Sequence, residues 1–200
     1  MATSVEICNM ALAKLGQRPI SSLDDTSNQT ARYCKTFYEQ SKTAVLREYP
    51  WSFASINREL ASVEVPEGYE KWGFAFGYPS DCLQARRLHD GIGNDYPYEV
   101  IIYRDGGGVD IKIIVTNLEV AYLNYSFNVN NNNLFDSQFV ESFVLYLAKE
   151  LAFPITKRSS VEKAMYERYL LSVPKAQNAD AEEQSSIVSP ENTWLEDRLS

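Results

Sequence analysis

The residue most able to do chemistry is His89, the only histidine among 200 residues. Any Ser-His-Asp hydrolase or histidine-based metal site would have to use it. Ser80 and Asp81 lie nearby in the sequence, but a triad is defined by geometry, and the GxSxG signature of a nucleophilic serine does not occur. We therefore predict that His89 is a loop histidine rather than a catalytic one.

Two glycine-rich stretches could hold an ion or a phosphate. HDGIGNDY, residues 89–96, has the composition of a calcium loop, but it lacks the oxygen spacing and terminal glutamate of an EF-hand and occurs once. GGG, residues 106–108, has neither the following lysine nor the helix of a phosphate cradle. Both stretches are predicted to be turns between strands.

The remaining reactive side chains show no catalytic spacing. Cys8, Cys34 and Cys82 are three cysteines without a CxxC pair, and they are predicted to be buried thiols. Glu182 and Glu183 are typical of a solvated helix face. The sequence therefore predicts no enzyme, with no catalytic residue, no cofactor and no metal ligand.

Composition and charge narrow the class of protein. A hydrophobic content of 44% is enough for a core. No stretch approaches the roughly 18 uninterrupted apolar residues of a membrane span, and the N-terminus has no basic leader, so we expect a soluble protein made in a cytoplasm. Nineteen basic and 27 acidic residues give a net charge of −8, the wrong sign for gripping DNA through its phosphates.

Two helices are expected near the N-terminus. Thr3 and Glu6 form a capping box, and apolar residues at helical spacing follow until Gly16. A second capping box at Thr26 and Gln29 precedes an amphipathic run of about 22 residues, or roughly 33 Å of helix.

The stretch YPWSFA, residues 49–54, ends that second helix. Pro50 removes an amide donor and disfavours helical geometry at Tyr49, so the helix must stop there. Trp51, Phe53 and Ile56 then alternate with small residues, which suits an extended strand. We predict that the Trp51 indole is buried between the helix and the following sheet, with its ring nitrogen bonded to a backbone carbonyl.

Residues 69–127 show the period-two alternation of β-strands. Strands are expected over 98–103 and 109–116, joined by the turn RDGGG, with a third in EVAYLNYSF, residues 119–127. Strands joined by short turns predict an antiparallel meander, which the asparagine run 128–133 ends.

Two more helices complete the pattern. Asp136 is the expected N-cap of a strongly apolar helix that Pro154 ends. A capping box at Ser159 and Glu162 opens the next helix, which Pro174 is expected to kink and which presents two apolar rows: Val161, Met165 and Tyr169, and Tyr166, Leu170 and Val173.

Beyond Gln184 the periodicity fails. SSIVSPENTWLEDRLS, residues 185–200, nevertheless carries five large apolar side chains: Ile187, Val188, Trp194, Leu195 and Leu199. Large apolar residues in an unpatterned tail favour a binding segment, with back-packing onto the chain itself as the alternative, so these five residues are candidate contacts with a partner.

The predicted fold class is α+β: a four-helix body with an inserted antiparallel β-sheet and an irregular C-terminal tail. The regions expected are a first part of the helical body, the inserted β region, a second part of the body and the tail, at residues 1–60, 61–134, 135–184 and 185–200.

Five segments together resemble one family. EICNMALAKLGQRPISSL, REYPWSFA, YPSDCLQARRL, FDSQFVESFVLYLAKELAFPIT and YERYLLSVPKAQNADAEEQ occur in this order from about residue 5 to 184. Each segment alone is weakly specific, and the ordered set is more so. It is similar to the head-to-tail adaptor of short-tailed bacteriophages, often called tail tubular protein A. The tail 185–200 and the asparagine run have no counterpart in this resemblance.

The resemblance implies a structural role in the virion tail, assembled in the host cytoplasm. Proteins of this family form a dodecameric ring beneath the portal, continue the DNA channel and dock the tail nozzle, with tail fibres as a further candidate partner. It also implies that Pro50, Trp51 and Phe53 form a structural junction between the helical body and the sheet, which the side chain of Trp51 holds together. A ring of twelve chains of charge −8 would carry about −96, which would let DNA pass without specific binding.

Two rival interpretations stay open. An acidic hydrolase of cell-surface polysaccharide would need two carboxyl groups roughly 5 to 10 Å apart, and the sequence does not locate such a pair. Another connector or tail-completion protein would share the structural class and differ in its neighbours.

Overall fold

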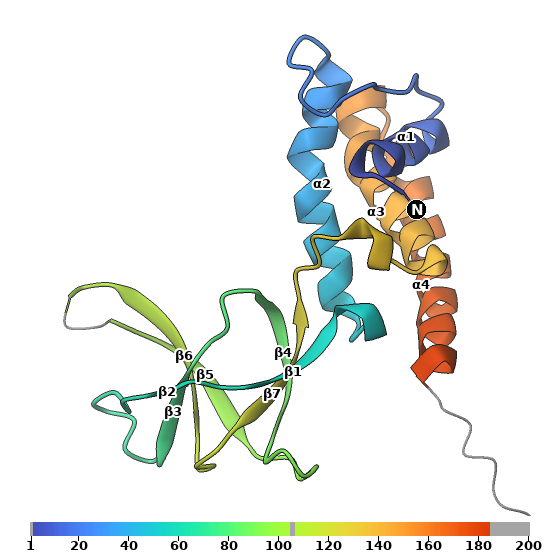
Figure 1. The fold of residues 1–200 in the computed structure, drawn as a ribbon. Helices are drawn as coiled ribbons and strands as arrows, with labels where there is room; N and C mark the ends of the chain where they lie inside the picture. The colour runs from blue at the N-terminus through green and yellow to red at the C-terminus, as the bar shows by residue number, and fades with distance from the viewer. Residues whose placement is uncertain (1, 105–106, 185–200) are drawn as a thin grey trace, which may run out of the picture.

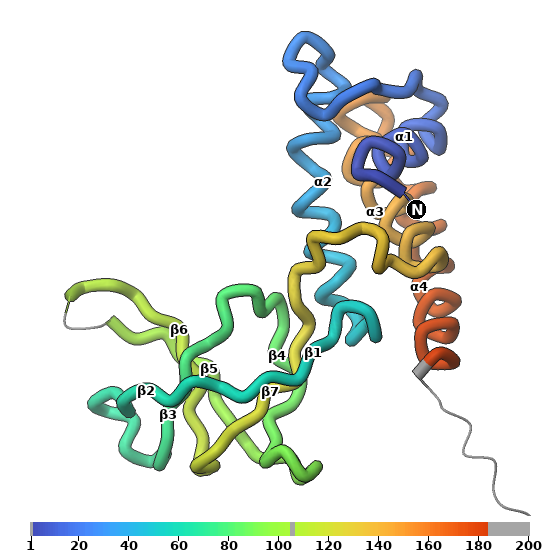
Figure 2. Tube along the Cα trace, in the orientation of Figure 1, coloured from blue at the N-terminus to red at the C-terminus, as the bar shows by residue number. Residues whose placement is uncertain are grey.

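The computed structural model describes residues 2–104 and 107–184 and has an α+β fold, as the sequence predicts. Figure 1 shows the helices gathered in one body and the strands in a separate β module beside the lower end of helix α2. The chain leaves the body after α2 and returns to it ahead of α3, a path that the tube in Figure 2 follows. The strands are therefore an insertion between the second and third helices.

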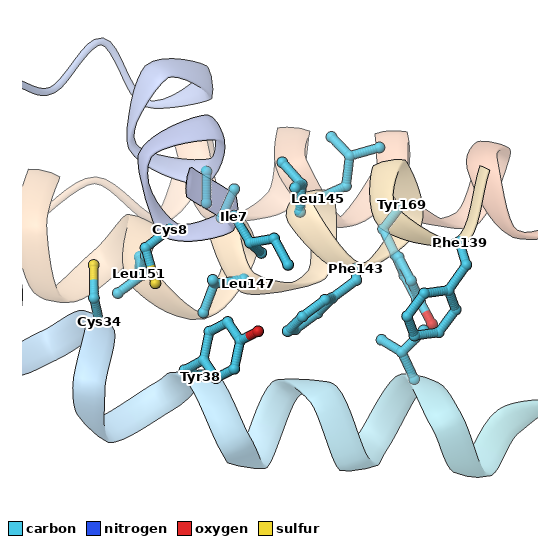
Figure 3. Close-up of a cluster of buried hydrophobic side chains, with 14 of the residues drawn as sticks. Ile7, Cys8, Cys34, Tyr38, Phe139, Phe143, Leu145, Leu147, Leu151 and Tyr169 are labelled. Atoms are coloured by element: carbon cyan, nitrogen blue, oxygen red, sulfur yellow. The ribbon is translucent and has the colours of Figure 1, made fainter. Parts of the chain in front are cut away.

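Helix α3 is the centre of the body and packs against each of the other three helices. The four helices are α1 (Ser4–Lys14), α2 (Gln29–Glu48), α3 (Ser137–Thr156) and α4 (Ser159–Gln184). Four α3 side chains at helical spacing are completely buried: Phe139, Phe143, Leu147 and Leu151. In Figure 3, Phe143 lies opposite Tyr38 of α2, and their rings meet edge to face at 5.3 Å.

The start of α1 confirms the predicted capping box, but the start of α2 does not. Thr3 and Glu6 bond each other's backbone amides at 3.2 and 2.6 Å. Helix α2 instead begins after Asn28, whose side-chain oxygen accepts from the amides of Thr30 and Ala31 at 2.9 and 3.4 Å. Asparagine is as good an N-cap as threonine, so the box at Thr26 was wrong and α2 has 20 residues.

Helix α3 confirms one prediction and corrects another. Asp136 is its N-cap and accepts from the amides of Gln138 and Phe139. Pro154, however, lies inside the helix, because the loss of one amide donor in the last turn does not break it. The helix ends where Lys157 takes a left-handed conformation, with φ of 59°, and donates its amide to the Phe153 carbonyl.

Helix α4 is longer than the apolar pattern suggests. Ser159 is its first residue rather than a cap that precedes it, and the helix continues through Pro174 to Gln184. None of the helices in residues 2–104 and 107–184 is both long and apolar enough to cross a membrane.

The end of α2 follows the proline rule. Tyr49 is extended, with φ of −139° and ψ of 150°, as a residue before proline should be. The expected strand through Trp51 and Phe53 was wrong, because Ser52–Ala54 form a short 3-10 turn, η1. Only Ile56 lies in a strand, and the sheet region begins at Ser55.

The strands form two antiparallel sheets. The first has the order β1–β7–β4 and the second β2–β3–β6–β5. Their bounds are β1 Ser55–Glu59, β2 Ser62–Val63, β3 Phe74–Gly77, β4 Cys82–His89, β5 Tyr98–Arg104, β6 Asp110–Thr116 and β7 Tyr122–Phe127. The hairpin of β5 and β6 confirms the predicted pairing. The meander was wrong at its last strand, since β7 pairs with β1 and β4 instead of β6.

Side-chain burial explains that change of sheet. Leu123 and Tyr125 of β7 are fully buried and pack with Phe76 and Ile114 of the second sheet. The other face of β6 is buried as well, through Ile113 and Val115, which share a separate small core. A single flat meander would leave one of these two faces exposed.

Candidate functional site

The junction between helical body and β module is built around Trp51. Its side chain is 1% exposed, and its ring nitrogen donates to the Val45 carbonyl of α2 at 3.0 Å. The ring lies 5.0 Å from Tyr49 and 5.2 Å from Phe139, edge to face in both cases. The expected burial and the expected hydrogen bond are confirmed, although the surrounding side chains come mainly from the helical core.

Phe53 and Pro50 complete the predicted junction. Phe53 is half-buried, and its ring lies 4.9 Å from Phe139 and 5.6 Å from Phe135. Pro50 is exposed, so its part is to end α2 rather than to fill the core. These contacts hold the turn η1 against the first part of α3.

Sequence reasoning missed Asp180, which fixes the same turn from α4. Asp180 is 2% exposed, and its Oδ1 accepts from the amide of Ser52 at 2.8 Å and from the Ser52 hydroxyl at 2.6 Å. The two residues lie 128 positions apart. The only signal in the sequence is its position: Asp180 follows Ala176 by one helical turn, on the helix face that packs inward.

Arg86 of β4 joins the module to the end of α2. Its guanidinium donates to the Arg47 carbonyl at 2.7 Å and to the Ser126 hydroxyl at 3.1 Å. The Arg47 side chain in turn donates to Gln84 at 3.2 Å. Because the last carbonyls of a helix have no partner within it, Arg86 satisfies one of them and orients the β module on α2.

The structure separates the residues that could have made a hydrolytic triad. Asp81 precedes β4 and His89 ends it, so an extended strand keeps them roughly 20 to 25 Å apart. His89 is 7% exposed, which corrects the prediction of a loop histidine. Its Nδ1 accepts from the Gly91 amide at 3.1 Å, and its Nε2 therefore faces Asn57 as the donor.

The predicted turns are confirmed where the structure describes them. Asp90 Oδ1 accepts from the amides of Ile92, Gly93 and Asn94, which closes HDGIGNDY as a turn between β4 and β5. The Asn94 side chain, together with those amides, lowers the pKa of Asp90. Its carboxylate is thus used by its own loop. Residue 106 of GGG lies outside the described residues.

The cysteines are structural where they are buried. Cys8 and Cys34 are fully buried between α1 and α2, whereas Cys82 is half-buried in β4. Contact with Cys34 and burial raise the pKa of Cys8, so its thiol stays neutral near pH 7. Within residues 2–104 and 107–184, no three histidine, cysteine or carboxylate side chains gather as metal ligands would.

A cavity of about 710 Å³ lies between the start of α4, the middle of α3 and the end of α2. Glu48 and Glu162 both line it, together with Tyr146, Lys149 and Tyr166. Two carboxylates in one cavity are a minimum for acid and base chemistry, but Glu48 already accepts from the buried Tyr169 hydroxyl. This arrangement braces α2 against α4 and presents no free pair of carboxylates.

Large apolar side chains lie on the outer surface of α4. Tyr166, Leu170 and Leu171 are 45%, 50% and 72% exposed. Of the predicted row Tyr166, Leu170 and Val173, only Val173 therefore packs against the core, which is filled from α4 mainly by Met165 and Tyr169. Tyr166 and Leu170, one turn apart, form an apolar stripe, and Leu171 lies about 100° further around the helix. Exposed apolar side chains of this kind are typical of surfaces that meet another chain.

The five candidate contact residues of the tail, Ile187, Val188, Trp194, Leu195 and Leu199, lie outside the described residues. Gln184, the last described residue, ends α4 next to the turn that Asp180 holds. In comparisons with known proteins, the chain matches no family model and no curated protein.

Proposed function

We propose that this chain is a structural protein of a bacteriophage virion, a ring-forming head-to-tail adaptor that docks on the portal and continues the DNA channel to the tail nozzle. Its place is the virion tail, assembled in the host cytoplasm. Its partners are further copies of itself, the portal protein, the nozzle protein and, as a further candidate, tail fibres. The role requires no catalytic residue and no cofactor.

The observation that supports this proposal most is where the family-like segments meet. Trp51 of REYPWSFA packs on Phe139 of FDSQFVESFVLYLAKELAFPIT. Ser52 bonds Asp180 of the segment that ends in NADAEEQ, and Arg86 of YPSDCLQARRL bonds the Arg47 carbonyl. Segments separated by up to 128 positions thus form one junction. The segments that carry the resemblance therefore belong to one structural unit, as the parts of an adaptor subunit should.

The remaining segment, EICNMALAKLGQRPISSL, belongs to the same unit. It supplies α1, which packs on α3, and Asn9 of α1 bonds both backbone groups of Ile20 at 2.8 and 2.9 Å. The loop that follows α1 is thereby fixed to the helix. All of the family-like segments therefore contribute to the helical body or to its connection with the β module.

Assembly into a ring is the first expected result. Particles of the purified chain, imaged with and without the portal protein of its virion, should show rings of about twelve subunits in the presence of portal. The exposed apolar stripe of α4 gives such a subunit a lateral contact to bury. A chain that stays monomeric and leaves the portal bare under these conditions would contradict the proposal.

The second expected result concerns DNA. At physiological salt the assembled protein should show no measurable duplex binding, because a net charge of −8 per chain repels phosphates. Titration of labelled duplex at two salt concentrations checks this. Tight binding that weakens steeply as salt rises would mean that basic residues grip the DNA, and the channel would not work by repulsion.

A further inference from the structure

A groove runs across the face of the helical body formed by α1, α3 and α4. Three adjoining hollows of about 530, 490 and 240 Å³ make it up. The first two share Met10 and Ala13, and the last two share Lys14 and Glu141, so the hollows are continuous. This face is distinct from the cavity beside Glu48.

The groove has an apolar floor and a basic end. Met10 and Leu171 are 37% and 72% exposed and Val140 is half-buried, while Val144 and Leu145, which also line the hollows, are buried. Met10, Val140 and Leu171 therefore present the apolar surface that large apolar side chains from outside can cover.

The basic end stands out in an acidic chain. Lys14, Arg168 and Lys175 line it with a single carboxylate, Glu141, which gives a local charge of +2 in a chain of −8. None of the three basic side chains forms an ion pair within the part of the chain that the structure describes. They are placed to attract a segment of opposite charge.

The apolar and acidic side chains of residues 185–200 are complementary to the apolar surface and the basic end of this groove. This segment carries five large apolar side chains, three acidic residues, Glu191, Glu196 and Asp197, and one basic residue, Arg198, for a net charge of −2. Sixteen residues span at most about 53 Å when extended, at roughly 3.3 Å per residue. That is longer than α4 itself, whose 26 residues rise about 39 Å, so the segment can extend beyond its own helical body.

We infer that the groove of α1, α3 and α4 binds residues 185–200 of a second copy of this chain. The choice of a second copy rests on the proposed function, because a tail seated in a neighbour's groove is a heterologous contact, and such contacts generate rings when the rotation closes. Trp194 and Leu195 bind the apolar floor, and Glu196 and Asp197 face the basic end.

A labelled peptide of residues 185–200 tests the groove. The receptor is the full chain carrying Trp194→Ala and Leu195→Ala, so that its own tail does not compete. Fluorescence anisotropy should show saturable binding, weakened at least about tenfold by Leu171→Asp in the receptor. Ile102→Asp is the matched control, since Ile102 is similarly exposed, at 68%, but lies in the β module. Equal losses from both substitutions, or no binding at all, would overturn the inference.

Charge reversal tests the direction of the tail. Arg168→Glu with Lys175→Glu should weaken the peptide at least about tenfold, and Glu196→Lys with Asp197→Lys in the peptide should restore binding to within about threefold. If peptide binding is lost and the reversed peptide does not restore it, then Glu196 and Asp197 do not face Arg168 and Lys175, and the proposed charge pairing is contradicted. Melting temperatures within a few degrees of the parent exclude misfolding as the cause.

Mixing two defective full chains tests whether the tail comes from a second copy. A groove variant, Leu171→Asp, keeps its tail, and the Trp194→Ala, Leu195→Ala variant keeps its groove. Their mixture should form 1:1 pairs in sedimentation velocity, while each alone stays monomeric. The parent chain, with tail and groove both intact, should also associate; peptide binding with a parent chain that stays monomeric would place the tail in its own groove and would overturn the second copy. Rings on portal that survive Leu171→Asp would overturn the inference and leave the adaptor proposal standing.

Discussion

Replacing Trp51 with alanine should lower the free energy of unfolding by about 3 to 5 kcal/mol, the usual range for a buried large aromatic side chain. The indole is 1% exposed and contacts the rings of Tyr49, Phe53 and Phe139, so its removal leaves a cavity where α2, η1 and α3 meet. Such a loss is a large part of a typical domain's stability. The variant subunit should unfold or aggregate before it assembles.

Chemical unfolding of the isolated subunit checks this prediction, with two comparisons. Trp51→Phe keeps most of the packing but leaves the Val45 carbonyl without its donor, and it should cost about 1 to 3 kcal/mol. Trp72→Ala, at a half-buried tryptophan of the β module, should cost less than Trp51→Ala. A Trp51→Ala subunit that melts near the parent temperature and fails only in assembly would show that Trp51 serves a contact between chains.

Local sequence signals predicted the helical body well. Thr3 with Glu6 and Asp136 are caps whose bonds lie within three residues, so the pattern contains all that determines them. Pro50 acts on the residue directly before it. The error at Thr26 arose because Asn28, two residues later, caps a helix equally well. The error at Pro154 arose because a proline in the last turn removes one amide donor without ending the helix.

The β module shows where local signals stop. Alternation located β5, β6 and β7, but it does not say which strand β7 joins. Its partner β1 lies more than 60 residues earlier, and Asn57 faces Asn124 across the pair. The preference arises from burial of Leu123 and Tyr125 against the second sheet, a property of the assembled module rather than of any window of sequence.

The residues of the candidate site also divide into those that local sequence signals reveal and those whose roles depend on distant parts of the chain. Trp51 was found because a large aromatic residue follows a helix-ending proline, a local signal. Asp180 and Arg86 were missed because each acts on a backbone group far away in the sequence. The sequence also left open which apolar row of α4 faces inward: periodicity shows two rows on that helix, and only the position of α3 decides that Met165 and Tyr169 face inward.

Asp180→Ala should lower the free energy of unfolding by about 2 to 3 kcal/mol, because it leaves the Ser52 amide and hydroxyl without their acceptor. Asn178→Ala, at an exposed position of the same helix, is the matched control and should stay within about 0.5 kcal/mol of the parent. Asp180→Asn keeps an oxygen acceptor and should fall between the two.

A double-mutant cycle with Ser52→Ala separates this contact from the general effect of changing α4. Coupling of about 1 kcal/mol or more is expected, since the Ser52 hydroxyl and the Asp180 carboxylate are 2.6 Å apart. Loss of hydrogen-exchange protection at the Ser52 amide should accompany Asp180→Ala. Asp180 lies four residues before Gln184, so the contact that fixes the turn after α2 also fixes the end of α4. If Asp180→Ala matches the parent in stability and in exchange at Ser52, then α4 does not hold the junction, and the packing around Trp51 holds it alone.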